Sequence, residues 1–241
     1  MGRTALLKAS SMKALEDLGR VRLSPNFYMR DFLYSEIASF YGIPNIPDDP
    51  DLAIKSGTRL CEELLEPLQA SFGRIAIRSA YRSCAVNEFG NQNKLNCASN
   101  EKNHAAHIWD RLDADGCMGA TACIVVPWFA ERYEKGADWR SLAWWIHDHL
   151  PYSTLVFYPK LAAFNIRWHE RPERWIRGTF PPYQGYLTKP GMANHGGRHV
   201  EWNEEFPKFT ANTTVRIVLS SPRSLPKEDN NARTRTRSTC V

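Results

Sequence analysis

The sequence predicts an α+β fold in a single domain, with a mixed, mostly antiparallel sheet flanked by helices. Two observations lead to this fold class. Helical patterns come first along the chain, and short apolar strands mixed with helices follow after residue 73. A chain of 241 residues with 43% hydrophobic content can bury a sizeable core. We expect a partly helical lead-in at residues 1–22, a folded domain at 23–220 and a disordered basic tail at 221–241.

The clearest helical pattern covers roughly Asp51–Phe72. Leucines recur at every fourth position of this segment, at Leu60, Leu64 and Leu68. Asp49-Pro50 caps its start and Gly73 ends it, while Pro67 is expected to bend or shorten the last turn. A shorter helix is predicted for Met29–Tyr41.

The second half of the chain carries the strand patterns. We predict strands at Ile75–Ser79, Ala122–Val126, Thr154–Tyr158, Phe164–Glu170 and Thr213–Leu219. Because Ala122–Val126 is apolar throughout, it is expected to be buried on both faces. A helix capped by Asp138 is predicted to run to about His149, and residues 171–210 are expected to be irregular.

The composition limits the classes of function. Thirty-one basic and 26 acidic residues give a net charge of +5, of which the tail at 221–241 contributes +3 (five basic residues against two acidic). The body is therefore nearly neutral and lacks the basic stripe of a nucleic-acid-binding domain, so nucleic acid is an unlikely partner. Six cysteines without a CxxC pair, no signal-peptide pattern and no membrane-spanning run favour a cytoplasmic, reducing location.

The segment from Arg74 to Pro127 holds most of the residues that could bind a metal or an anion. Between two predicted strands lies a polar insert rich in Asn, His and Asp. Ser79 and Arg82 end the first strand, where an arginine can bind a carboxylate through two hydrogen bonds. A structural arginine that holds loop carbonyls is the alternative. If the chain has a site, we expect it in this segment.

Four motifs follow one another along residues 23–127. They are Leu23-Ser24-Pro25-Asn26-Phe27, Leu65-Glu66-Pro67-Leu68, Ile77-Arg78-Ser79-Ala80-Tyr81-Arg82-Ser83 and Gly119-Ala120-Thr121-Ala122-Cys123-Ile124-Val125-Val126-Pro127. In this order they resemble the zinc D-Ala-D-Ala peptidases, a family with the Hedgehog-like metallopeptidase fold. Phe164-Asn165-Ile166-Arg167-Trp168-His169 looks like that family's final strand with its terminal His. The resemblance covers roughly residues 23–170.

The resemblance implies a zinc ion held by His, Asp and His, which acidifies a bound water and polarises a peptide carbonyl. Arg82 matches the family arginine, and His169 matches the last ligand. The family Asp falls on Cys123, and the first His falls on Gly116, one position before Cys117. We therefore predict a zinc site of Cys117, Cys123 and His169. The alternative is that Cys123 is a small buried strand residue and that Cys117 is incidental.

The same resemblance assigns substrate binding to Ser79, Tyr81 and Arg82, with Arg82 steadying the developing charge. The family's carboxylate falls on Ile166, so the general base is unassigned. Glu170, Asp110 and Asp113 are the candidates for this role.

The histidines offer other arrangements. His104, His107 and Asp110 form an alternative metal set if that stretch is helical, and a polar surface loop otherwise. His195 and His199 are predicted to lie in a loop that could close over the site as a lid. His149 is expected to pack in the core.

Two functions follow from these patterns. One is a zinc-dependent peptidase that hydrolyses D-Ala-D-Ala in a peptide or small molecule derived from the cell wall. The alternative is a non-catalytic member of the same fold that binds a peptide or a partner protein. A cell-wall substrate lies outside the cytoplasm, so the first function requires release by a non-classical route, as in phage-type hydrolases, or a cytoplasmic dipeptide substrate.

Overall fold

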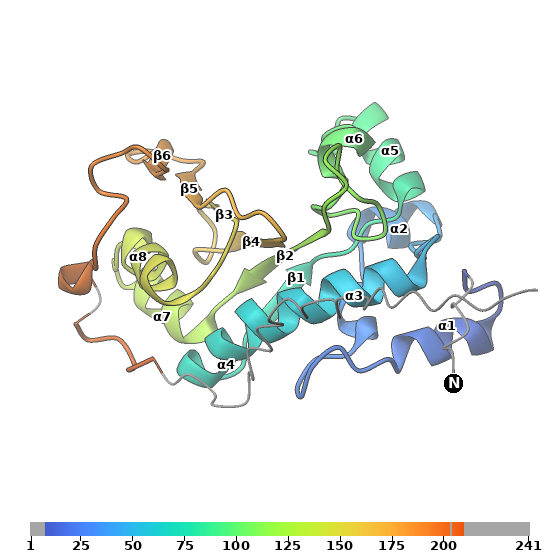
Figure 1. The fold of residues 1–241 in the computed structure, drawn as a ribbon, viewed down its shortest axis with the longest axis horizontal. Helices are drawn as coiled ribbons and strands as arrows, with labels where there is room; N and C mark the ends of the chain where they lie inside the picture. Colours follow the sequence, from blue (N-terminus) through green and yellow to red (C-terminus); the bar gives the residue numbers. More distant parts are fainter. Residues whose placement is uncertain (1–7, 203, 210–241) are drawn as a thin grey trace, which may run out of the picture. The chain divides into compact units, whose positions relative to one another are not determined.

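The computed structural model describes residues 8–202 and 204–209, which belong to one structural unit. Its fold is α+β, with a six-stranded, mostly antiparallel sheet (Figure 1). Across the sheet the strands follow the order β1 (Ala76–Ser79), β2 (Gly119–Val125), β4 (Phe164–His169), β3 (Thr154–Phe157), β5 (Trp175–Gly178) and β6 (Gly185–Thr188). The pair β3–β5 is parallel, and the other four pairs are antiparallel. The predicted fold class is therefore confirmed at this level.

Helices precede the sheet and separate its strands. They are α1 (Met12–Gly19), η1 (Met29–Phe32), α2 (Glu36–Tyr41), α3 (Pro50–Leu60), η2 (Cys61–Leu65), α4 (Glu66–Phe72), α5 (Cys84–Gln92), α6 (Asn100–Asn103), α7 (Pro127–Glu134), α8 (Trp139–His149) and η3 (Val200–Trp202). Figure 1 shows α3 and α4 as one long helical path beside β1 and β2. The core lies between this path and the sheet.

The helical path from α3 to α4 matches the long helix predicted for Asp51–Phe72, with one change. Its middle, η2, is a π-helical turn that ends two residues before Pro67. Proline has no N–H to donate, so a locally widened turn fits it into a continuous helix. Leu60, Leu64 and Leu68 have no exposed surface, as their spacing predicts.

Glu66 explains why two of the sequence motifs occur together. One carboxylate oxygen accepts hydrogen bonds from Ser24 Oγ and from the backbone N–H of Asn26, both at 2.7 Å. The other oxygen accepts from Asn26 Nδ2 at 2.7 Å. Glu66 is largely buried, so these bonds fix the turn at 24–26 against α4. This pair of motifs therefore has a structural role.

Several predicted boundaries were wrong. The helix predicted for Met29–Tyr41 is divided into η1 and α2, because Ser35 caps α2 through its side chain. Residues 171–210, expected to be irregular, contain β5, β6 and η3. Their strands are only four residues long, and β5 is specified by its pairing with β3 rather than by a local pattern. The strand predicted for Thr213–Leu219 and the tail lie outside the described residues.

The strands place different chemistry on the two faces of the sheet. Ala120, Ala122 and Ile124 of β2 are fully buried in the apolar core. Because side chains alternate along a strand, Thr121 and Cys123 point to the opposite face. This second face, around β2 and β4, carries the polar residues described below.

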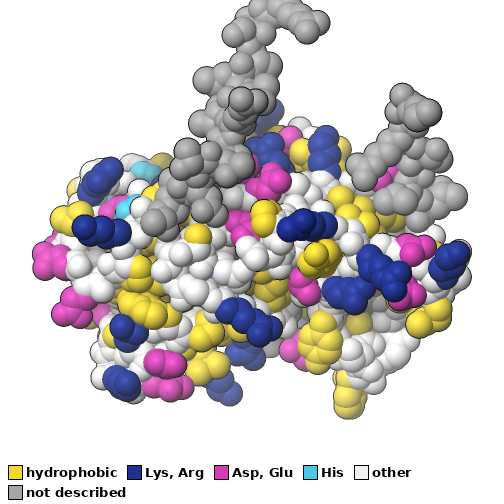
Figure 2. Space-filling model, turned by 90° about the horizontal axis from the view of Figure 1, so that it is seen from below, with side chains coloured by type: hydrophobic (Ala, Val, Ile, Leu, Met, Phe, Trp, Pro, Cys, Tyr) yellow, Lys and Arg dark blue, Asp and Glu magenta, His cyan; other side chains and the backbone are white. Residues whose placement is uncertain are grey.

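The outer surface mixes charges of both signs. On the face shown in Figure 2, Lys and Arg side chains are interspersed with Asp and Glu, and no continuous basic stripe crosses it. Among the described residues, no helix combines the length and the hydropathy needed to cross a bilayer.

Candidate functional site

A row of polar side chains crosses the second face of the sheet. Ser79 of β1 pairs with Cys123 of β2, which pairs in turn with Asn165 of β4. Neighbouring strands lie about 4.8 Å apart, so the three side chains are close together. A pocket of about 340 Å³ opens beside Ser79 and Cys123 of this row. Its polar lining consists of Glu36, Arg78, Ser79, Cys123, Tyr158 and Lys160.

His107 reaches the same region from the central insert. Its Nδ1 lies 2.8 Å from the carbonyl oxygen of Ala80, which can only accept, so Nδ1 carries the proton. Burial, reinforced by the nearby Arg82 cation, lowers the pKa of His107 to about 3. The imidazole is therefore neutral above that pH. Its Nε2 lone pair faces Asn165 Nδ2 at 3.4 Å.

Asn165 links the histidine to a tyrosine. Its Nδ2 also donates to the hydroxyl oxygen of Tyr158 at 3.1 Å. Burial raises the pKa of Tyr158. Burial also raises the pKa of the Cys123 thiol, and this effect outweighs the lowering by the Arg78 and Arg82 cations. His107, Tyr158 and Cys123 thus stay uncharged near neutral pH. The thiol of Cys123 lacks the lowered pKa that an activated nucleophile requires.

Arg82 supplies a positive charge to this neutral cluster. Its guanidinium contributes to the pKa shifts of His107, Cys123 and Tyr158, so it lies within electrostatic range of all three. Its backbone N–H donates to the carbonyl of His107 at 2.8 Å. Arg82 Nη1 contacts Asn87 Oδ1 at 3.3 Å and Cys97 Sγ at 2.6 Å. No carboxylate among the described residues forms an ion pair with this half-buried cation.

The structure does not bring His169 to this cluster. His169 is on the strand next to β2, but it pairs with Gly119, whereas Cys123 pairs with Asn165. Four residues of extended strand separate the two positions by about 13 Å. His169 Nε2 contacts Asp113 Oδ2 at 2.9 Å, and its Nδ1 lies 3.1 Å from the backbone N of Arg171. The imidazole of His169 and the thiol of Cys123 therefore have separate surroundings.

Cys117 lies on the His169 side of the insert. Its backbone N–H donates to Asp113 Oδ1 at 2.8 Å. Although burial opposes the shift, hydrogen bonds from Cys117 and His169 lower the pKa of Asp113. Glu170 accepts a hydrogen bond from the backbone N–H of Met118 at 2.7 Å. Asp113 and Glu170, both considered as general bases, thus bind the protein itself.

The alternative metal set is also distributed among different partners. Asp110 is buried, and its Oδ2 accepts backbone N–H groups of Asp48 and Asp49 at 2.7 and 3.4 Å. His107 instead contacts Ala80 and Asn165. Among the described residues, no group of at least three His, Cys, Asp or Glu side chains is arranged to hold a metal ion.

Tyr81, predicted to bind substrate, has no exposed surface. Its ring packs edge-on against Trp109 at a centroid distance of 6.1 Å. Burial, and then the Asp110 carboxylate, raise the pKa of its hydroxyl. Tyr81 is therefore a core residue, whereas Ser79, two positions earlier, lines the pocket.

His195 and His199, in the segment after β6, belong to a second polar cluster that packs against α8. They do not line the pocket beside Cys123. His199 stacks on Trp144 at 3.8 Å between ring centroids, and its Nδ1 contacts Asp148 Oδ1 at 2.8 Å. His195 Nδ1 contacts Thr188 Oγ1 at 3.1 Å. These contacts attach the segment after β6 to α8. His149 is half-buried, with its ring 4.7 Å from that of Trp145.

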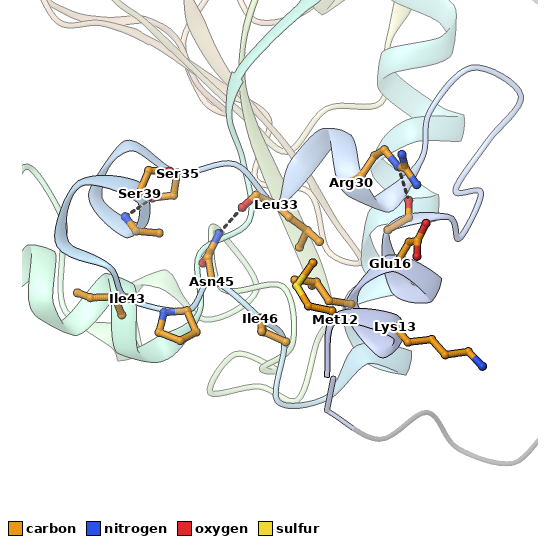
Figure 3. Close-up of a pocket in the computed structure, with 14 residues that line it drawn as sticks. Met12, Lys13, Glu16, Arg30, Leu33, Ser35, Ser39, Ile43, Asn45 and Ile46 are labelled. Atoms are coloured by element: carbon orange, nitrogen blue, oxygen red, sulfur yellow. Dashed lines mark hydrogen bonds between the residues drawn. The ribbon is translucent and has the colours of Figure 1, made fainter. Parts of the chain in front are cut away.

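A separate cavity of about 780 Å³ lies near the N-terminus (Figure 3). Apolar side chains such as Met12, Leu33 and Ile46 line it, with Lys13 and Arg30 also contributing. None of the residues predicted from the sequence to form a site lines this cavity.

Sequence reasoning missed several residues of the candidate site. The sequence patterns place Asn165 only in the motif that ends at His169 and Tyr158 only at the end of a strand. The alternation of Asn165, Arg167 and His169 does indicate that they share a face. It does not indicate which of them lies opposite Cys123. Searches of protein-family models, curated proteins and solved structures returned no match to this chain.

Proposed function

We propose that this chain is a non-catalytic member of the Hedgehog-like metallopeptidase fold that binds the carboxylate end of a peptide. One observation carries the proposal: Arg82 is half-buried within electrostatic range of Cys123 and Tyr158, which line the pocket, and it lacks a carboxylate partner among the described residues. Withdrawing a cation from water is unfavourable unless an anion or good hydrogen bonds compensate. A ligand carboxylate would supply both.

The residues that line the pocket support an anionic ligand. Arg78 and Lys160 contribute two positive charges and Glu36 one negative charge, and no ion pair among the described residues neutralises any of the three. Ser79 and Tyr158 add hydroxyl groups that can donate hydrogen bonds. Arginine and hydroxyl donors suit a carboxylate, while Glu36 can accept an N–H group of the same ligand.

The donor atoms fit a zinc centre incompletely. In the family pattern, ligands on neighbouring strands share one metal ion. Here Asn165, a neutral amide, stands opposite Cys123, and the matched His169 lies four residues further along β4. The good zinc donors near this position are then Cys123 and His107, one fewer than the three that a catalytic zinc site uses. We therefore favour ligand binding over zinc-dependent hydrolysis.

Zinc-dependent hydrolysis of D-Ala-D-Ala is the second candidate, and one observation favours it. His107 donates from Nδ1 to a backbone carbonyl and leaves Nε2 with a lone pair, as metal-binding histidines commonly do. Elemental analysis of the purified protein separates the two candidates. Stoichiometric zinc that is lost in both His107→Ala and Cys123→Ala but retained in His169→Ala would favour the peptidase.

Calorimetric titration tests the binding function directly. We expect the dipeptide D-Ala-D-Ala to bind through its free carboxylate and its C-terminal amide to bind much more weakly. Arg82→Gln should remove about 2 kcal/mol of binding free energy, roughly thirtyfold in Kd, because a charge-assisted hydrogen bond is lost. Because Arg82 also contacts Asn87, its replacement can disturb the fold as well as the ligand contact. Lys160→Gln is therefore a second variant, at an exposed position. Arg74→Gln, outside this pocket, is the control. Equal affinities for acid and amide would refute the proposal.

A further inference from the structure

One residue that lines the pocket beside Cys123 belongs to α2, a short helix that also carries exposed aromatic side chains. Glu36 lines the pocket, and Phe40 lies one helical turn further along the same face. Phe40 is 82% exposed. Its ring packs edge-on against Tyr41 at 4.9 Å, and Tyr41 contacts Phe89 of α5 at 4.6 Å. We call Phe40, Tyr41 and Phe89 the aromatic ledge.

A second exposed apolar side chain follows another residue that lines the pocket. Lys160 lines the pocket, and Leu161 follows it with 40% of its surface exposed. Both belong to the turn between β3 and β4, closed by a hydrogen bond from Ala163 N to Lys160 O at 3.0 Å. Leu161 and Ala162, the two central residues, have φ angles of +60° and +47°.

This turn is costly for the residues that form it. Two consecutive left-handed residues make a type I′ turn, for which Asn-Gly is the favoured sequence. Leucine and alanine are each disfavoured there, because their Cβ atoms approach the backbone. Residues held in such conformations cluster at ligand-binding sites. The turn thus presents Leu161 to solvent beside the pocket at the expense of stability.

We propose that the ligand is a peptide with a free C-terminal carboxylate and a large apolar side chain one or two residues before it. The carboxylate would lie near Arg82, Arg78 and Lys160, and the apolar side chain would rest between Phe40 and Leu161. This inference rests on the proposed carboxylate binding and specifies the ligand class. Apolar rims beside a cationic pocket complement a ligand that joins both characters.

The spacing agrees with this class of ligand. Four residues of helix, about 6 Å at 1.5 Å per residue, separate the level of Glu36 from that of Phe40. An extended peptide advances about 3.4 Å per residue, so this distance corresponds to one or two residues. A pocket of about 340 Å³ accommodates a chain end rather than a folded surface.

Four peptides test the inference by calorimetric titration. They are N-acetyl-Gly-Phe-Ala and N-acetyl-Gly-Gly-Ala, each with a free C-terminus and as the amide. The Phe peptide acid should bind about fivefold more tightly than the Gly peptide acid, as expected for one aromatic contact. Phe40→Ser should abolish this preference. Tyr186→Ser is the control, since Tyr186 is an exposed aromatic on β6, at the opposite edge of the sheet from β1.

A second variant separates ligand binding from folding. Replacing Leu161→Asn together with Ala162→Gly should raise the unfolding temperature, since the turn then has favoured residues, and should reduce the preference for the Phe peptide. If the turn has only a structural role, the double replacement should raise the unfolding temperature and leave the preference for the Phe peptide unchanged.

The outcomes are distinguishable. Equal binding of the two acids, with both tighter than the amides, overturns this inference and leaves carboxylate binding intact. Equal binding of acids and amides overturns both. If Phe40→Ser leaves peptide affinity unchanged but lowers the sedimentation coefficient, the aromatic ledge joins two copies of the chain and the inference is wrong.

Discussion

The neutral state of His107 makes a quantitative prediction about stability and pH. This imidazole is buried, and its pKa in the folded protein is about 3, against about 6.5 in an unfolded chain. Protons therefore bind the unfolded state more strongly. The stability that this histidine provides is fully present above pH 6.5 and is lost as the pH falls from there towards 3.

The size of the effect follows from linkage. At pH 5 the unfolded histidine is protonated and the folded one is not. Each pH unit below 6.5 costs 1.36 kcal/mol, so the loss between pH 7.5 and pH 5 is about 2 kcal/mol from His107 alone. Burial also lowers the pKa values of His147 and His195, which adds losses of the same sign.

Comparing two variants isolates the contribution of His107. His107→Gln replaces the imidazole with an amide that can still donate to the Ala80 carbonyl but does not titrate. Urea unfolding followed by tryptophan fluorescence at pH 7.5 and pH 5 gives the two free energies of unfolding. We expect the fall in stability of His107→Gln to be smaller than that of the parent by about 2 kcal/mol.

His104→Gln is the matched control, because His104 lies in the same loop and is only half-buried. It should retain the pH dependence of the parent protein. If His107→Gln loses stability between the two pH values as steeply as the parent does, His107 is not held neutral by burial, and the electrostatic description of the candidate site is wrong.

Two further substitutions test the structural framework. Glu66→Gln should lower the free energy of unfolding by about 2 kcal/mol in a urea titration, since it weakens three charge-assisted bonds, whereas the partly exposed Glu62→Gln should have little effect. Gly119→Ala should lower the unfolding temperature sharply, because its Cβ would lie 2.1 Å from the Ala105 carbonyl oxygen, whereas Gly196→Ala, where that space is open, should not. A small change at Gly119 would mean that the insert does not pack against β2 as described.

Local sequence patterns predicted much of the fold. The leucine spacing located the path from α3 to α4, and Asp138 marked the start of α8. These features depend on residues close together in the sequence, so periodicity and capping reveal them. The insert could not be predicted in the same way. Its position depends on long-range backbone bonds, such as Arg82 N to His107 O and Thr121 N to Ala106 O.

The candidate site depended on strand register, which the sequence left open. Motif order placed His169 and Cys123 on neighbouring strands, and they do lie on β4 and β2. They also share a face, since Cys123 pairs with Asn165 and His169 lies four residues after Asn165 on the same strand. However, two antiparallel strands can pair in many registers that keep this arrangement of faces. A shift of two residues leaves every side chain on the same face and changes only which residues lie opposite one another. The observed register puts Asn165 opposite Cys123 and removes His169 from the cluster.

The electrostatics of this cluster support the proposed binding of an anion. Burial keeps His107, Cys123 and Tyr158 in their neutral forms at pH 7, so these neighbours of Arg82 do not balance its charge. Among the described residues that line the pocket, Glu36 is the only carboxylate that a ligand carboxylate would meet. An electrostatic contact of this kind weakens as ions screen it. Affinity for the dipeptide acid should therefore fall as sodium chloride rises from 20 to 500 mM, while any residual affinity for the amide should remain nearly constant. Salt-independent binding of the acid would mean that an uncharged group, rather than Arg82, Arg78 or Lys160, recognises the ligand.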